Sequence, residues 1–279
     1  CWSPPSLNVD PQAVRAALVD GLDALVPVHF GGVPVSTEVY EACRDAGVPV
    51  VEDAAHAIGA TDRRGRVAGQ GNVGACFSFY ANKNLSSGEG GAIATDDPDL
   101  AAFATSYRLH GLDRDAWARY RPDSAVVQYD LLGPGIKANL PDVLATLARA
   151  QLARFDELQA CRRRLIDRYR ARLAAWPDIT MVPPEPVEGS ADHLAVVLLP
   201  ERVDRDAVRS ELAAVGVGTS VHFRPLHDFG WFREAKIPIG PTGVETAERL
   251  RSRVLSLPLY PDLSEAEVDR VCEALGEAL

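Results

Sequence analysis

The sequence predicts an α/β fold, with an incomplete, mainly parallel sheet covered by helices on both faces, followed by a small α+β domain. Two observations lead to this expectation. In the first half, short apolar, β-branched stretches alternate with helical patterns, as is typical of parallel sheets. Further along, a proline-rich stretch at 176–190 separates a long helical region from a second group of strands and helices.

In the first half, the expected elements are short and closely spaced. We expect strands at 24–30 (ALVPVHF) and 48–53 (VPVVED), on either side of a helix at 36–47 that Gly47 closes. Two more strands are expected at 74–80 and 91–95, before a helix at 96–111. Residues 140 to about 176 then show an arginine-rich helical pattern, long enough to carry the chain out of the first domain.

After the proline-rich stretch, a smaller unit is expected. It has strands at 193–199 and 218–223, a helix at 204–216 and a closing helix from Ser264. We therefore expect a larger domain at 1–175, which includes the connecting helix, and a smaller α+β domain at 176–279.

Composition narrows the class of protein. A net charge of −10 and a pI of about 5.1 argue against nucleic acid or an anionic membrane as partner. No stretch has the length of a membrane span or the pattern of a signal peptide. The five cysteines are dispersed and lack metal-ligand spacing, which fits free thiols in a reducing compartment. We expect a cytoplasmic protein without a metal.

Lys83 is unusual because this chain otherwise uses arginine. The only other lysines are Lys137 and Lys236, and Lys83 lies between the strand at 74–80 and a glycine-rich turn at 88–91. A carbonyl cofactor needs a primary amine to form a Schiff base, and arginine cannot supply one. A single loop lysine is more often a surface residue, so its context decides between the two interpretations.

That context contains three polar residues. Asp53 ends a buried strand, where α/β sheets place ligand sites, and a carboxylate there suits a pyridinium nitrogen. A helix N-cap is the alternative for Asp53. His56 could meet a ring or a phenolic oxygen, although a lone histidine is more often structural. Ser78 alternates with its aromatic neighbours, so its hydroxyl could face the same cleft and hold a phosphate.

Five motifs in this order resemble the DegT/DnrJ/EryC1/StrS aminotransferases. These are pyridoxal-phosphate enzymes of fold type I that mostly aminate nucleotide-linked keto sugars. The motifs are EDAAHA (52–57), FSFYANKNLSSGEGGAIAT (77–95), GIKANLPDVLATLARAQL (135–152), VGTSVHFRPLH (217–227) and LSLPLYPDLSEAEVDRV (255–271). The resemblance runs from about Asn8 to the end of the chain, and the motifs are specific as a set.

The resemblance implies roles for the residues around Lys83. Lys83 would hold pyridoxal 5'-phosphate and later move the proton between the substrate carbon and the cofactor. Asp53 would pair with the pyridine nitrogen, His56 would lie by the ring and its 3′-oxygen, and Ser78 would bind the phosphate. Family dehydratases carry histidine in place of the lysine, so Lys83 favours transamination.

The resemblance also implies a homodimer with shared active sites. Asn139 would reach the phosphate in the neighbouring subunit, with Lys137 as the alternative. His222 and Arg224 would approach the substrate, at a sugar-nucleotide diphosphate or the carboxylate of the amino donor. An exposed pair at a strand end is the alternative for these two. His29 matches the family pattern as well, and we interpret it as structural.

The chain departs from the family pattern before the stretch LNVDPQAV (7–14). Complete members have a preceding segment with a helix start whose amides hold the phosphate, and an aromatic that stacks on the ring. We expect either a fragment of a full enzyme, a segment supplied by another chain, or a truncated protein that does not catalyse. Retention of Lys83, Asp53 and Ser78 favours the fragment.

The sequence thus predicts an aminotransferase that moves an amino group from glutamate or glutamine to a nucleotide-linked keto sugar. Two alternatives stay open. One is a non-catalytic chain with a role in assembly or regulation, which would not bond the cofactor at Lys83. The other is a related enzyme that aminates a cyclitol or another keto-carbocycle in antibiotic synthesis.

Overall fold

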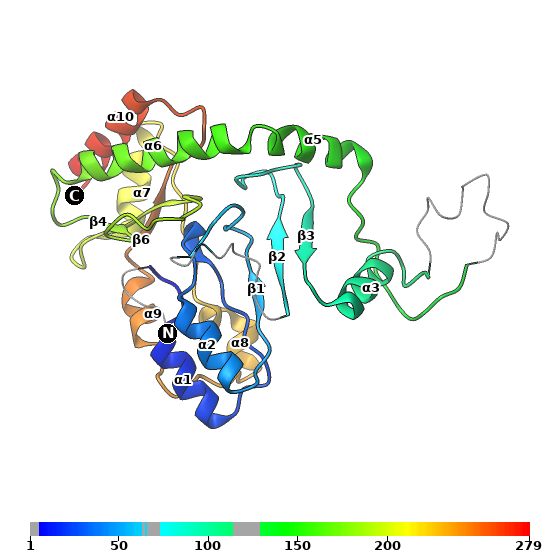
Figure 1. Cartoon of the computed structure of the whole chain (residues 1–279). Helices are drawn as coiled ribbons and strands as arrows, with labels where there is room; N and C mark the ends of the chain where they lie inside the picture. Colours follow the sequence, from blue (N-terminus) through cyan, green and yellow to red (C-terminus); the bar gives the residue numbers. More distant parts are fainter. Residues whose placement is uncertain (1–5, 63–64, 66–72, 114–128) are drawn as a thin grey trace.

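The first sheet has three strands in the order β1-β2-β3. The computed structural model describes residues 6–62, 65, 73–113 and 129–279 (Figure 1). β1 (Val51–Asp53) pairs in parallel with β2 (Gly74–Ser78), as expected, whereas β3 (Gly91–Ala94) pairs antiparallel with β2. No helix lies between β2 and β3, and a parallel crossover usually needs one, so the chain folds straight back.

The strand expected at 24–30 is present only in part. Leu25 and Val28 form isolated parallel bridges to Val50 and Asp53, so this stretch runs beside β1 without forming a full ladder. It ends in a short 3₁₀ helix, η1 (Phe30–Gly32), in which Gly32 has a φ of +92°. A Cβ at Gly32 would lie 3.0 Å from the backbone oxygen of His56, so the close approach of these two loops requires glycine.

Two helices pack beside the stretch of chain that leads into β1 (Figure 1). α1 (Pro11–Asp20) begins at Asp10, whose carboxylate accepts from the Gln12 N–H, and it was not expected from the sequence. α2 (Thr37–Asp45) is the helix expected at 36–47, capped by Ser36. The two helices contact each other, and their apolar faces enclose a small core. It contains Val14, Val35, Val39, Tyr40, Cys43, Val48 and Val50.

The long helical region joins the two halves of the molecule. After α3 (Pro98–Tyr107), which lies within the expected 96–111 helix, the chain forms α5 (Asp142–Leu152) and α6 (Phe155–Leu173). A short break at Ala153 and Arg154 divides what the sequence predicted as one helical stretch. Figure 1 shows α5 above the first sheet and α6 continuing toward the C-terminal elements.

The second sheet is antiparallel throughout. β4 (Thr180–Val182), β5 (Ala195–Leu198) and β6 (Val254–Leu257) lie in that order. The strand expected at 218–223 is wrong: only Ser220 makes a bridge, to Ser256 of β6. The chain leaves β6 after this one residue pair, and Pro225, which has no N–H, follows soon after.

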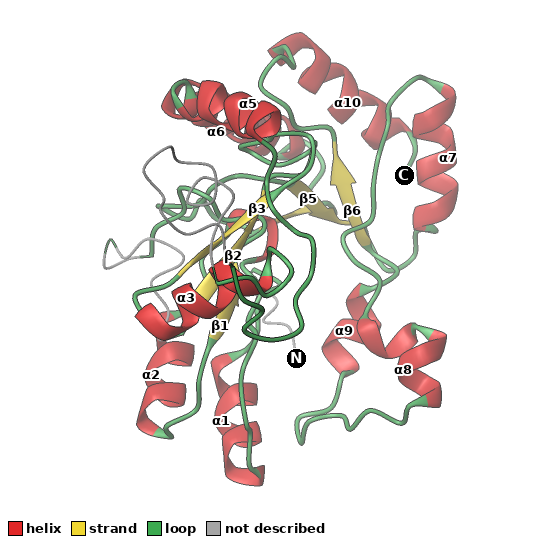
Figure 2. Cartoon of the chain, turned by 90° about the vertical axis from the view of Figure 1, so that its right-hand side faces the viewer, coloured by secondary structure: helices red, strands yellow, loops and turns green. Residues whose placement is uncertain are grey.

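Helices complete the C-terminal half (Figure 2). α7 (Arg205–Ala214) and α10 (Glu265–Glu277) match the two expected helices, and Ser264 and Glu267 form a capping box at the start of α10. Between β5 and β6 lie α7, η2 (Leu226–Asp228), α8 (Gly230–Glu234) and α9 (Glu245–Leu250). Of these, η2, α8 and α9 were not expected from the sequence.

The largest core lies between α6, the second sheet, α7 and α10. Leu165, Tyr169 and Leu173 of α6 are buried in it, and Tyr169 donates to the Pro258 carbonyl at 2.8 Å. The C-terminal part of α6 therefore packs with residues beyond 176. The domain boundary at 175 stays a prediction.

Two further expectations concern free thiols and membrane-spanning helices. Cys43, Cys76, Cys161 and Cys272 are free thiols, and Cys1 lies outside the described residues. Across the described residues, no helix is both long and apolar enough to cross a membrane.

Candidate active site

Three of the predicted site residues lie at the edge of the first sheet where the parallel strands β1 and β2 end. Asp53 is the last residue of β1, Ser78 is the last of β2, and Lys83 lies in the turn that follows. Asp53 pairs in register with Cys76, and Ser78 follows two residues later on the same face of β2. The sheet therefore brings a carboxylate, a hydroxyl and the lysine turn to an edge where α/β sheets bind ligands.

Lys83 is half-buried, and its backbone N–H donates to the Tyr80 carbonyl at 3.0 Å. Burial lowers the pKa of Lys83, while the negative charge of Asp53 acts in the opposite direction and is the smaller effect. A lowered pKa gives the amine a larger neutral share, and the neutral form attacks carbonyl groups. Lys83 is therefore suited to act as a nucleophile.

Asp53 has one oxygen fixed by its own turn. Its Oδ1 accepts from the Ala55 N–H at 3.1 Å, and Oδ2 has no hydrogen-bond partner among the described residues. The residues that follow Asp53 form turns and not a helix, so the N-cap interpretation does not hold. One carboxylate oxygen is thus left for a ligand.

His56 is buried beside two other aromatic rings. Its ring centroid lies 4.4 Å from that of His193 and 5.8 Å from that of Phe223, which stacks on it. Burial, with smaller effects from Lys83 and His222, lowers the pKa of His56 to about 3, so the ring is neutral. Nδ1 accepts from the Gly31 N–H at 3.3 Å, which leaves the proton on Nε2.

Ser78 is half-buried at the end of β2. Its Oγ accepts from the Tyr80 N–H at 3.3 Å, so its own proton stays available for a ligand. The position on the same face as the partner of Asp53 agrees with the alternation on which the sequence argument depended.

His222 and Arg224 have different surroundings. Nδ1 of His222 lies 2.8 Å from Ser256 Oγ. Burial, followed by the charge of Lys83, lowers the pKa of His222. This ring therefore belongs to one group with Asp53, His56, Ser78 and Lys83, which we call the Lys83 cluster. Arg224 is exposed, and it donates to the Asp228 carbonyl at 2.7 Å. Among the described residues, Arg224 has no contact with the cluster.

Lys137 and Asn139 lie together. The Lys137 ammonium donates to Asn139 Oδ1, and Lys137 also forms a bridge with Leu109 at the end of α3. The structure gives neither residue a contact with Asp53, His56 or Lys83 within the described chain. Their role at a neighbouring subunit stays a prediction.

Sequence reasoning missed two buried residues at the site, Asn84 and His193. Asn84 follows Lys83, and its amide nitrogen donates to the Ala191 carbonyl at 2.6 Å and to Gln159 Oε1 at 2.9 Å. Its Oδ1 lies 2.9 Å from His193 Nδ1. Burial, followed by the charge of His56, lowers the pKa of His193 to about 2. The available signals were an asparagine directly after Lys83 and a histidine at the start of the strand expected at 193–199.

His29 is held inside the first core. Its Nε2 lies 2.7 Å from Glu52 Oε2, its Nδ1 accepts from the Val35 N–H at 3.1 Å, and Tyr40 donates to the same Glu52 oxygen. Both ring nitrogens are thus used within the fold, in agreement with the structural interpretation of His29.

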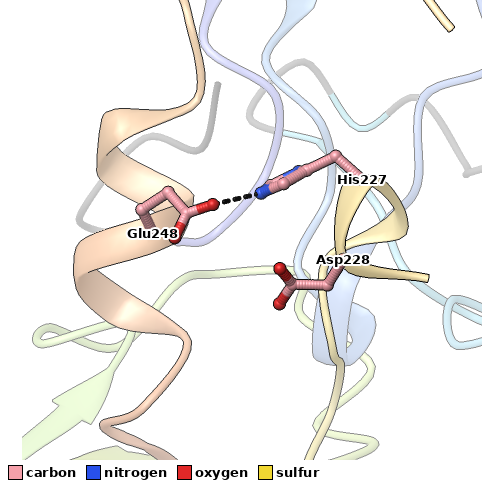
Figure 3. Close-up of side chains that lie close together, drawn as sticks. All are labelled: His227, Asp228 and Glu248. Atoms are coloured by element: carbon pink, nitrogen blue, oxygen red, sulfur yellow. Dashed lines mark hydrogen bonds and ion pairs between the residues drawn. The ribbon is translucent and has the colours of Figure 1, made fainter. Parts of the chain in front are cut away.

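A second polar cluster lies between η2 and α9 and consists of His227, Asp228 and Glu248 (Figure 3). His227 Nε2 is 2.7 Å from Glu248 Oε1. Arg251 donates to both oxygens of Asp228, at 2.6 and 2.7 Å, and lies 3.2 Å from Glu248. A metal ion would have to displace this guanidinium, so the cluster is an ion-pair network that ties η2 to α9.

The groups around Lys83 fit pyridoxal phosphate. An amine with a lowered pKa suits its aldehyde, the open oxygen of Asp53 suits its ring nitrogen, and Nε2–H of neutral His56 suits its phenolic oxygen. Ser78 adds a hydroxyl for a phosphate oxygen. Each of these donors and acceptors comes from a strand end or from the loop after it.

Comparison with known proteins agrees with this chemistry. The sequence profile of the DegT/DnrJ/EryC1/StrS aminotransferase family matches residues 2–276. DesV of S. venezuelae, solved in complex with a ketimine intermediate, is 32% identical with a TM-score of 0.82, and the match covers 99% of this chain and 70% of DesV. TlmJ, an aminotransferase from Streptoalloteichus hindustanus, is 29% identical with a TM-score of 0.84, covering 99% and 71%.

A third similar structure is DesI, solved in the presence of its TDP-sugar product. It is 29% identical with a TM-score of 0.81, and the match covers 98% of this chain and 66% of DesI. The fold is that of the pyridoxal-phosphate-dependent aminotransferases. The chain belongs to the DegT/DnrJ/EryC1/StrS family of aminotransferases.

Proposed function

We propose that this protein transfers an amino group from glutamate or glutamine to a nucleotide-linked keto sugar, using pyridoxal phosphate held by Lys83. The observation that carries the proposal is the position of Lys83: a half-buried lysine with a lowered pKa, beside Asp53, at the carboxyl edge of a parallel strand pair. Family membership supports the reaction class, and the sugar substrate is our proposal.

The bound cofactor would supply an electron sink for the carbon that loses or gains a proton. Asp53 would keep the ring nitrogen protonated, because an anionic oxygen stabilises the pyridinium form. The amine of Lys83, once released, is the base that takes the proton from the amino donor and returns it to the sugar carbon. Buried His56 remains neutral and donates from Nε2.

We also propose a cytoplasmic homodimer whose subunits share their active sites. Around Lys137 and Asn139, large apolar side chains are exposed on α3, on residues 129–136 and on α5. They include Phe103 (60% exposed), Leu131 (61%), Leu132 (69%), Ile136 (49%), Val143 (75%) and Leu147 (52%). Exposed apolar side chains in this number favour a protein–protein interface, and Asn139, in the segment between residues 129–136 and α5, could reach a partner's cofactor.

The reaction is tested by absorbance of the purified protein with pyridoxal phosphate, before and after L-glutamate or L-glutamine is added. We expect a visible band from the lysine-bound cofactor that bleaches when either donor transfers its amino group. Lys83→Ala should abolish the band. Lys236→Ala, which removes an exposed lysine outside the site, should keep it.

A band that persists in Lys83→Ala, or no band in the wild-type protein, contradicts the proposal and favours a non-catalytic chain. The amino acceptor is identified with protein whose cofactor has already taken the amino group from the donor. This protein is mixed in turn with TDP- and UDP-linked keto sugars and with a keto-cyclitol. Regeneration of the band by the cyclitol alone contradicts the nucleotide-sugar assignment.

A further inference from the structure

A small polar cavity lies next to the Lys83 cluster. Its volume is about 170 Å³, and its polar lining comes from Asn82, His193, Ser220, His222 and Ser256. This volume is below that of sites that enclose a drug-sized ligand, so the cavity has room for only a part of such a ligand. Among the described residues, no lysine, arginine, aspartate or glutamate lines the cavity.

Asn84 fixes the tautomer of His193. The amide nitrogen of Asn84 donates to the Ala191 carbonyl and to Gln159, so its Oδ1 must accept from His193 Nδ1–H. The proton of this neutral ring is therefore on Nδ1, and Nε2 carries a lone pair. His193 is 4% exposed and lines the cavity, and no described residue donates to its Nε2.

The backbone on either side of His193 is fixed as well. Gln159 Nε2 donates to the Ala191 carbonyl at 2.7 Å, and buried Arg162 of α6 donates to the carbonyls of His193 and Leu259 at 3.5 and 3.2 Å. A histidine held this firmly in one tautomer is a preorganised acceptor. A ligand that fills the cavity without donating a hydrogen bond leaves this buried acceptor unpaired, and it therefore binds more weakly than a ligand that donates to Nε2.

We propose that Nε2 of His193 accepts a hydrogen bond from a neutral donor group of the substrate, a sugar hydroxyl or a carboxamide N–H, in this cavity. The hydroxyls of Ser220 and Ser256 and the amide of Asn82 serve the oxygen of the same group. Because the lining is uncharged, a carboxylate or a phosphate gains less there than a hydroxyl or an amide. The inference deepens the proposed function and depends on it for the identity of the two substrates.

Two substitutions separate the roles of the two ring nitrogens. His193→Asn keeps an amide N–H where Nδ1 donates to Asn84 and removes the acceptor at Nε2. His193→Gln places an amide oxygen near Nε2 and gives up the contact with Asn84. The visible band of the bound cofactor, and the midpoint of urea unfolding, report for each variant whether the site is intact.

Binding is measured by calorimetry with TDP-glucose and with TDP alone, and the KM of the amino-donor half-reaction with L-glutamine and L-glutamate. A sugar hydroxyl as ligand predicts that His193→Asn reduces the preference for TDP-glucose over TDP by about 3- to 10-fold, the range of one neutral hydrogen bond. A carboxamide as ligand predicts a rise of about the same factor in the KM for L-glutamine alone. His193→Gln should recover part of either loss.

The proposal is overturned if His193→Asn behaves like wild type in both arms, or if its losses only follow a loss of the cofactor band. The calorimetric arm does not use the cofactor. A protein without a visible band at Lys83 but with the predicted loss on TDP-glucose would therefore contradict the proposed reaction and still support the role of His193.

Discussion

At the scale of single residues, burial at the site favours the neutral forms of one lysine amine and three histidine rings. Lys83, His56, His193 and His222 all have pKa values lowered mainly by burial, and each charge would disfavour the others. Asp53 is the anion that opposes this effect on Lys83. Burial therefore increases the neutral share of the Lys83 amine, and the charge of Asp53 partly offsets that increase.

The effect of Asp53 on Lys83 has a defined sign. Asp53→Asn removes the charge that raises the pKa of Lys83, so the pKa of Lys83 should fall further. The measurement is the pH dependence of amine labelling at Lys83 in cofactor-free protein, read by peptide mass spectrometry. Exposed Asp156→Asn is the matched control, and a midpoint that rises or stays in Asp53→Asn would contradict the account.

The pKa of about 3 for His56 also has a consequence for stability. Between these two pKa values, the unfolded chain, in which histidine has a pKa of about 6.5, binds a proton at His56 and the folded chain does not. Stability is thus unaffected above pH 6.5 and decreases as the pH falls from 6.5 toward 3. Between pH 7 and 5 the loss is about 1 to 2 kcal/mol for this histidine.

His56→Asn isolates that loss, because an asparagine oxygen can still accept from Gly31 and does not titrate. The free energy of unfolding in urea should fall by about 1 to 2 kcal/mol less between pH 7 and 5 than in wild type. His110→Asn, at an exposed histidine, is the control. Equal pH dependence in His56→Asn and wild type would mean that His56 is charged in the folded protein.

At the scale of elements, the Lys83 turn is anchored to the long helix. Asn84 links the turn to Gln159 of α6 and to the loop before β5. Sequence patterns could predict α2, α6, α7 and α10, because their caps and apolar spacing are local. They could not predict this anchor, since Asn84 and His193 are 109 residues apart in the chain. The strand expected at 218–223 is a single bridge at Ser220 for a related reason, because its pairing depends on Ser256, which is distant in the sequence.

Replacing Asn84 by aspartate tests the anchor. Aspartate keeps the shape, loses both amide donors and sets a buried charge against the Ala191 carbonyl and Gln159 Oε1. We expect a loss of about 2 to 4 kcal/mol in the free energy of unfolding. Asn82→Asp, two residues away and exposed, should change it by less than about 0.5 kcal/mol. Equal effects of the two changes would contradict the anchoring role.

At the scale of the whole molecule, the proposed dimer depends on the exposed apolar side chains of α3, residues 129–136 and α5. The sequence could bring Asp53, His56, Ser78 and Lys83 together because they lie at or directly after the ends of two adjacent parallel strands, β1 and β2. It could not settle the role of Lys137 and Asn139, because their side chains contact each other and the proposed contact with a neighbouring subunit depends on a second chain.

Shared sites predict complementation between two inactive variants. Lys83→Ala and Asn139→Ala should each lose amino transfer as homodimers. A mixed dimer rebuilds one intact site, so co-expressed variants should recover about a quarter of wild-type activity. Sedimentation analysis with Leu132→Asp should show dissociation to monomers. Complementation that stays at zero in confirmed mixed dimers would place Asn139 in its own subunit's site, and full activity of Asn139→Ala alone would place it outside both sites.

The central claim, that Lys83 carries the cofactor, is tested most directly by borohydride reduction of the protein with pyridoxal phosphate, followed by peptide mass spectrometry. The chain makes this measurement unambiguous, because Lys137 and Lys236 are the only other lysines. We predict the added pyridoxyl mass on the peptide that contains Lys83, and its absence after prior treatment with L-glutamate. A label on Lys137 or Lys236 with Lys83 unmodified would contradict the account.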